Sequence, residues 1–214
     1  GSVSGNTVDT SASDGIRVVC AGVDASAGLT GICLSRNHIT SPTNKGVYVR
    51  TDSGGVTPTI DGMILSGNVV VSAGTDGFQV ISAGAATGLA ITGNTVNGAV
   101  EAGILVSTSG DLKSANISSN SLSQWSSSAG QYGIAITAPD AIAVVVGSNA
   151  LRNTLNDVVG MVFTVDGQSR GFNVHDNTIV LSGGGTSQSL VFNASAGASQ
   201  AGMSFVGNSF RQAD

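Results

Sequence analysis

Apolar residues recur along the chain in one unit that is copied about every 28 residues. The clearest copy spans residues 88–106. Its first half has apolar residues five and three positions before an asparagine and two positions after it. Its second half has a glycine followed by apolar residues one and three positions later. Apolar residues at alternate positions are typical of β-strands rather than helices.

Eight asparagines mark the first half of the unit, and successive ones are 26 to 31 residues apart. They are Asn6, Asn37, Asn68, Asn94, Asn120, Asn149, Asn177 and Asn208. The second half recurs at Gly15, Gly46, Gly77, Gly103, Gly133 and Gly160, and Ser189 takes the place of the glycine in the seventh copy. A period of this length, held over most of the chain, indicates a solenoid with one circuit per repeat.

Each repeat is predicted to hold three short strands: one before the asparagine, one just after it and one after the glycine. No two-residue hairpin turn follows any of them, so equivalent strands of successive repeats must stack in parallel. Strands about 4.8 Å apart give seven coils a length of roughly 34 Å. The asparagines are then expected to form a hydrogen-bonded ladder at one corner, in the left-handed conformation that asparagine tolerates. The glycines are expected at a second bend, where a Cβ would clash.

This pattern resembles the right-handed parallel β-helix of pectate-lyase-like proteins. The resemblance rests on the asparagine corner and on the glycine-led strand, and it covers nearly the whole chain. It implies an all-β, right-handed, single-stranded parallel β-helix (solenoid) of about seven coils of 26–31 residues, with the asparagine ladder at one corner. The chain is also similar to the shafts of bacteriophage tailspikes and polysaccharide depolymerases, which implies a homotrimer in an extracellular location or on a virion surface.

At 214 residues the chain is long enough for one domain. We expect residues 1–2 to be a cloning scar and residues 3–214 to be the β-helix domain. Neither end shows a cap, which indicates part of a longer chain. A net charge of −5 and a pI near 4.7 argue against nucleic acid as a partner. No apolar run of about 18 residues is present, so no membrane span is expected.

The first candidate site is the outer face of the glycine-led sheet in the first four coils. Its residues are Asp14, Arg17, Lys45, Tyr48, Arg50, Asp76, Gln79 and Glu101. Asp14 and Asp76 lie two coils apart, about 10 Å, close to the separation of about 6.5–9.5 Å in an inverting glycosidase. The family resemblance implies that a lyase would use Arg17, Lys45 or Arg50 as its base, with the acids holding calcium. The alternative is a solvated face of mixed charge that keeps the solenoid soluble.

The second candidate site lies in coil five, where extra residues within 123–132 carry the only tryptophan, Trp125, with Tyr132 close behind. Aromatic rings stack on the apolar faces of sugars, so this insertion is a candidate substrate-binding platform. The alternative is that Trp125 folds back to cover an irregular coil. In the late coils the outward residues of the glycine-led strand are Ala135, Val162 and Val191, which indicates a face covered by another subunit.

Three functions are compatible with these features. The first is a carbohydrate-binding or polysaccharide-degrading domain, in which Tyr48, Gln79, Arg50, Trp125 and Tyr132 bind the polysaccharide. The second is a structural or adhesive shaft without chemistry, and the third is a stand-alone uronate polysaccharide lyase or epimerase. No metal site is expected from His38 and His175, because neither has a second ligand at metal-like spacing. No cofactor is expected, apart from calcium if the protein is a lyase.

Overall fold

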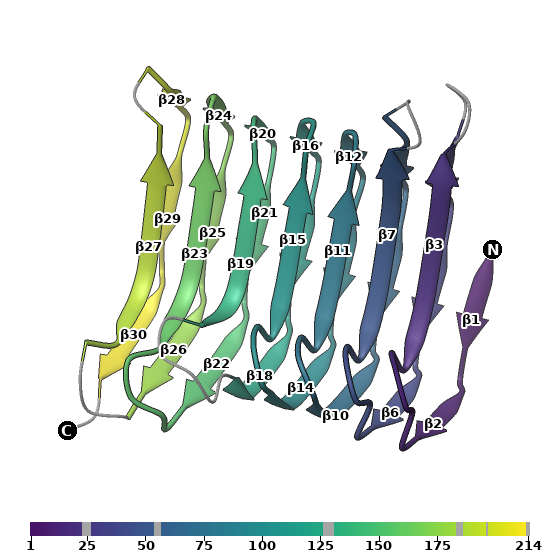
Figure 1. The fold of residues 1–214 in the computed structure, drawn as a ribbon. Helices are drawn as coiled ribbons and strands as arrows, with labels where there is room; N and C mark the ends of the chain where they lie inside the picture. The colour runs from purple at the N-terminus through teal and green to yellow at the C-terminus, as the bar shows by residue number, and fades with distance from the viewer. Residues whose placement is uncertain (23–26, 54–56, 126–130, 183–185, 196, 213–214) are drawn as a thin grey trace.

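The computed structural model describes residues 1–22, 27–53, 57–125, 131–182, 186–195 and 197–212, and all the regular elements in these segments are β-strands. The strands form four parallel sheets that run along a solenoid of about seven turns (Figure 1). Because each strand pairs with its equivalent one turn away, the architecture confirms the parallel β-solenoid predicted from the repeat. Among the described residues, none belongs to a helix long and apolar enough to cross a membrane.

Sheets A and B flank the asparagine corner. Sheet A contains β1 (Ser2–Ser4), β5 (Cys33–Ser35), β9 (Ile64–Ser66), β13 (Ala90–Thr92), β17 (Asn116–Ser118), β21 (Val145–Gly147), β25 (Asn173–His175) and β29 (Ser204–Val206). Sheet B contains β2 (Thr7–Asp9), β6 (His38–Thr40), β10 (Val69–Ala73), β14 (Thr95–Ala99), β18 (Ser121–Trp125), β22 (Ala150–Asn153), β26 (Thr178–Leu181) and β30 (Ser209–Gln212).

Sheets C and D complete each turn. Sheet C contains β3 (Ile16–Gly22), β7 (Val47–Ser53), β11 (Phe78–Ser82), β15 (Ile104–Thr108), β19 (Tyr132–Ala138), β23 (Val159–Val165) and β27 (Gln188–Ala194). Sheet D contains β4 (Gly28–Thr30), β8 (Thr59–Asp61), β12 (Ala86–Thr87), β16 (Leu112–Lys113), β20 (Ala141–Ile142), β24 (Gln168–Arg170) and β28 (Ser199–Ala201). Sheet C is the glycine-led sheet of the sequence pattern.

The prediction of three strands per repeat was wrong, because a fourth short strand, that of sheet D, precedes sheet A in each turn. The residue six positions before each ladder asparagine after the first has a positive φ and bends the chain between these two sheets; Gly62, Ser114 and Ala143 are examples. The apolar residue five positions before the asparagine follows this bend. It is buried in five of these seven turns, at Met63, Leu89, Ala115, Val144 and Phe172, so it points inward from a corner rather than from a strand.

The asparagine ladder is present and includes all eight predicted residues. Seven side-chain hydrogen bonds of 2.9–3.0 Å join consecutive amides, each from Nδ2 of one asparagine to Oδ1 of the next. The expected left-handed conformation belongs instead to the residue before each asparagine, such as Arg36 (φ 53°) or Gly67 (φ 62°). The preceding residue therefore makes the turn, and the asparagine keeps a backbone that points its amide into the corner.

The glycine bend is sterically required, as predicted. A Cβ added at each of the six glycines would lie 2.5–2.7 Å from the carbonyl oxygen of the equivalent residue in the next turn. The seventh position is occupied by Ser189, which lies in β27, the last strand of sheet C in the described part of the chain. A side chain is accommodated there because no further described turn packs against it.

Replacing Gly77 by alanine is expected to destabilise the fold by about 1–3 kcal/mol, because the new Cβ would overpack the bend. It would lie 2.6 Å from the carbonyl oxygen of Gly103 and 2.6 Å from Cγ1 of Val96. Denaturant unfolding measures the change. The matched control is Ser189→Ala, which should cost less than about 0.5 kcal/mol. Equal losses in the two variants would contradict a steric role for the glycine.

The core is a continuous column of inward side chains that runs the length of the solenoid. Equivalent apolar residues stack turn on turn, as Val47, Phe78 and Ile104 do in sheet C. The last turns hold an aromatic group in which the rings of Phe163 and Phe172 meet edge-on with centroids 5.0 Å apart. The inward positions are thus filled, and any site must be built on the outer faces.

Candidate functional site

The outer face of sheet C changes in character along the solenoid. One outward row, read from the first turn to the last, consists of Arg17, Tyr48, Gln79, Leu105, Ala135, Val162 and Val191. In this row the residues of the first three turns are polar or charged, and those of the last four are apolar. The polar end is therefore the better candidate for recognising a ligand.

Tyr48 is the centre of a cationic cluster on this face. The guanidinium carbon of Arg17 lies 5.5 Å from the centroid of the Tyr48 ring, and Nζ of Lys45 lies 5.1 Å from it. Nη1 of Arg50 donates a hydrogen bond of 3.1 Å to the Tyr48 hydroxyl. Cations attract the face of an aromatic ring, so Tyr48 gathers three of the eight Lys and Arg residues onto adjacent turns. We call Arg17, Lys45, Tyr48 and Arg50 the Tyr48 cluster.

The Tyr48 cluster presents its cations, not its ring. Tyr48 is only 7% exposed, although its position faces outward. Arg17 and Arg50 are exposed, whereas Lys45 is half-buried. Hydrogen bonds to Tyr48 and to Asp52 raise the pKa of Arg50, so its charge is fixed at any physiological pH. Arg50 is ion-paired with Asp52, and Nη1 of Arg17 lies 4.0 Å from Oδ2 of Asp14. An anion at the cluster would therefore compete with these carboxylates, and it would find no free aromatic plane for stacking.

The two acids proposed as a catalytic pair are engaged in the corner before sheet C. Oδ1 of Asp14 accepts a hydrogen bond from the backbone N–H of Lys45, at 3.2 Å, and its side chain is 5% exposed. Oδ1 of Asp76 accepts one from the N–H of Ala102, at 3.1 Å, and Oδ2 accepts one from Gln79, at 2.8 Å. These contacts fix the corner between turns. A glycosidase needs carboxyl groups that reach the substrate, and those of Asp14 and Asp76 are bonded within the corner. A catalytic role for the pair stays a prediction.

Asp76 is the strongly perturbed acid of this face. Burial raises its pKa to about 6, against the opposing hydrogen bond from the N–H of Ala102. Exposed Glu101 raises the pKa further, and Lys45 lowers it. Glu101 lies beside Asp76 at this corner, and its own N–H donates to the carbonyl of Thr75. The pKa of Asp76 is raised because its carboxyl group is held in the corner, where little water reaches it and the charged form is disfavoured.

Replacing Asp76 by asparagine is expected to remove a pH-dependent loss of stability. The folded-state pKa of about 6 lies above the ordinary value of 3.8, so the folded protein keeps a proton that the unfolded chain has released. The loss is absent below about pH 4, grows as the pH rises and is complete above about pH 6, at roughly 2–3 kcal/mol. The measurement compares free energies of unfolding of the two proteins across this range. A difference in unfolding free energy between the two proteins that stays constant with pH would contradict the raised pKa of Asp76.

The structure corrects the location expected for Trp125. This residue ends β18, and its side chain is fully buried. It packs over sheet C, where Cζ2 lies 3.2 Å from the position of a Cβ on Gly133. The prediction of an exposed aromatic platform was therefore wrong for Trp125, and the alternative of a covering residue is correct. Tyr132 begins β19 and is half-buried, while residues 126–130 of the insertion lie outside the described residues.

The apolar stripe of the late turns is in the predicted place. Ala135 is 3% exposed, and Val162 and Val191 are half-buried. These values describe a close-packed apolar surface with little protruding area. Its contact with another subunit stays a prediction.

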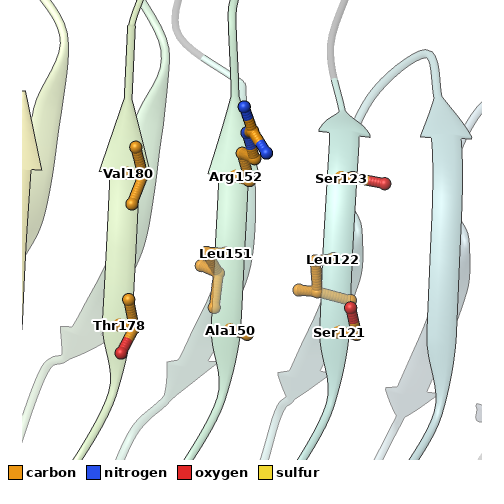
Figure 2. A pocket seen from close by; sticks show the side chains of 8 residues that line it. All are labelled: Ser121, Leu122, Ser123, Ala150, Leu151, Arg152, Thr178 and Val180. Carbon is orange, nitrogen blue, oxygen red and sulfur yellow. The ribbon is translucent and has the colours of Figure 1, made fainter. Parts of the chain in front are cut away.

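A hollow of about 300 Å³ on sheet B was not predicted from the sequence. It lies across β18, β22 and β26, as Figure 2 shows, with Ser121, Ala150 and Arg152 among its lining residues. The repeat contained a usable signal, because the positions one and three after each asparagine form the outward rows of this sheet. The residues at these positions are small at Ser121 and Ala150, and the residue is a cation at Arg152.

No metal-binding group emerges from the described residues. No three His, Cys, Asp or Glu side chains gather there in a way that could hold an ion. His175 and Asp176 do point together, with Nδ1 3.0 Å from Oδ2, but they form only a pair.

No family model, curated protein or solved structure matches the chain. The functional argument therefore rests on the solenoid and on its surface chemistry. The class of protein that these define is an all-β parallel solenoid that carries the Tyr48 cluster on the outer face of sheet C.

Proposed function

We propose that the protein binds polysaccharide along the outer face of sheet C, and that acidic sugar units contact the Tyr48 cluster. The observation that carries the proposal is the gathering of three cations on adjacent turns of a chain whose net charge is −5. A guanidinium forms strong, charge-assisted hydrogen bonds with a carboxylate. The regular spacing of the turns, about 4.8 Å, suits a ligand that is itself a repeating polymer.

The binding test compares acidic and neutral polysaccharides on the whole 214-residue protein. Polygalacturonate and alginate should bind, dextran should not, and added salt should weaken the binding. The triple variant Arg17→Ser, Lys45→Ser, Arg50→Ser should bind more than about tenfold less tightly. The matched control is Arg36→Ser, Lys113→Ser, Arg170→Ser, which removes the same charge from elsewhere. Equal losses in both triples would reduce the proposal to non-specific attraction.

The second candidate is a structural or adhesive shaft. It is favoured by the engagement of Asp14 and Asp76 in the corner and by the apolar stripe of Ala135, Val162 and Val191. No binding across the panel would favour this alternative. The release of unsaturated sugar ends, detected by absorbance, would instead favour a uronate lyase.

A tailspike-like or depolymerase-like role is the finer form of the proposal and rests on resemblance to the pectate-lyase-like family. In that form the protein is a trimeric shaft, extracellular or on a virion, and the apolar stripe of Ala135, Val162 and Val191 contacts the neighbouring subunits. Sedimentation equilibrium tests the subunit number. A monomer at every accessible concentration would remove the trimer from the proposal.

A further inference from the structure

The hollow on sheet B arises from the sizes of outward side chains on three neighbouring strands. In the row nearest the asparagine corner, Ser121 pairs with Ala150, which pairs with Thr178. In the next row, Ser123 pairs with Arg152, which pairs with Val180. Small side chains in β18 and at Ala150 leave a depression across the three strands, and Figure 2 shows the side chains that line it. Its volume of about 300 Å³ is at the lower end of the range for small-ligand sites.

Arg152 gives the hollow a fixed positive charge. It is exposed, and no carboxylate of the described residues lies within ion-pair distance of it. Arg211 occupies the same row two strands further on, beyond Val180, and so lies about 10 Å away. An anionic group at the hollow therefore meets one guanidinium directly and a second along the row.

The other residues that line the hollow determine which chemical groups can lie beside the anionic group. The hydroxyl groups of Ser121 and Thr178 offer hydrogen bonds, and that of Ser123, which donates to Oδ1 of Asn97 at 3.2 Å, can still accept one. Ala150 and Val180 offer apolar surface. A sugar ring has an apolar C–H face and a rim of hydroxyl groups, so it matches this mixture. A carboxylate on the ring would complete the match by bonding to Arg152.

We propose that the hollow on sheet B is a second carbohydrate site, which binds one carboxylate-bearing sugar unit. The carboxylate pairs with Arg152, the ring lies over Ala150 and Val180, and the serine and threonine hydroxyl groups bond to the ring hydroxyls. The site lies on a different sheet from the Tyr48 cluster and shares no residue with it. It therefore does not rest on the function proposed for sheet C.

The test uses the full chain with Arg17, Lys45 and Arg50 changed to serine, so that the Tyr48 cluster does not contribute. The probes are a trisaccharide of hexuronate units and its methyl ester, which keeps the rings but lacks the charge. The acid should bind at least about tenfold more tightly than the ester, as a charge-assisted contact requires. Titration followed by amide chemical shifts should show the largest changes at β18, β22 and β26.

Two further substitutions in this background separate charge from shape. Arg152→Ser should weaken binding of the acid about tenfold or more, and Ala150→Trp should abolish it by filling the hollow without changing the charge. Arg170→Ser, an exposed arginine on sheet D, is the matched control and should leave binding unchanged. Unchanged thermal unfolding confirms that each variant is folded. Binding that survives both hollow variants, or falls equally in the control, would overturn the proposal.

Discussion

Replacing Asn120 by alanine is expected to destabilise the protein by about 3–5 kcal/mol. Oδ1 of Asn120 accepts hydrogen bonds from the backbone N–H and from the amide of Asn94, each at 3.0 Å. Its Nδ2 donates to Ile91 at 2.8 Å and to Asn149 at 3.0 Å. Asn120 is 1% exposed, so water cannot replace these bonds. Each buried polar group left without a partner costs about 1–3 kcal/mol.

The matched control is Asn6→Ala at the exposed first rung of the same ladder. Asn6 also bonds to the next asparagine, with Nδ2 2.9 Å from Oδ1 of Asn37, but it is open to solvent. Its loss should cost less than about 1 kcal/mol, because water satisfies the groups that it leaves. Denaturant unfolding of both variants measures the difference. Similar losses of unfolding free energy in Asn120→Ala and Asn6→Ala would mean that the buried hydrogen bonds of the ladder do not stabilise the fold.

The ladder also explains why so much of the fold is predictable from the sequence. A side chain that must bond to its own copy in the turn above and the turn below fixes both the spacing and the register of the chain. Asn94 and Asn120 are 26 residues apart, and Asn37 and Asn68 are 31 apart, yet each pair is joined in the same way. Variation in length is therefore absorbed elsewhere in each turn. The glycine bend adds a second fixed point, because only a residue without a Cβ fits beneath the next turn.

The fourth sheet was missed because three of its seven strands, β12, β16 and β20, have only two residues, which breaks the pattern along the chain. β12 consists of Ala86 and Thr87, and β16 of Leu112 and Lys113. Two residues carry one inward and one outward position, which no pattern search distinguishes from a loop. The bend that separates sheets D and A is also hidden in the sequence, because glycine, serine and alanine all adopt its positive φ.

The candidate site was predicted as a set of residues but not as an arrangement. Alternation placed Arg17, Tyr48 and Gln79 on one outward row, and the structure does so too. Alternation alone does not reveal that cations cover the Tyr48 ring, because long side chains reach across neighbouring turns. It also does not reveal that the carboxylate of Asp76 turns into the corner to accept an N–H. Position on a face follows from the repeat, whereas the direction of a long or polar side chain follows from its neighbours.

Replacing Trp125 by alanine is expected to destabilise the protein by about 3–5 kcal/mol, because it removes a large, fully buried side chain from the core. The ring fills the space over Gly133, and Trp125 pairs in register with the much smaller Ala99 of the turn before. Denaturant unfolding measures the loss, and a blue-shifted emission of the native protein should report the buried environment of this sole tryptophan.

Trp125→Phe is the matched control, since it keeps an aromatic ring in the same place. It should recover most of the lost stability and should bind acidic polysaccharide as the unaltered protein does, because the buried ring does not touch the ligand. Saturating polysaccharide should likewise leave the tryptophan emission unchanged. A Trp125→Ala protein that unfolds normally but no longer retains polysaccharide would contradict this. It would return Trp125 to the surface and make the insertion of coil five, rather than the Tyr48 cluster, the place where sugar binds.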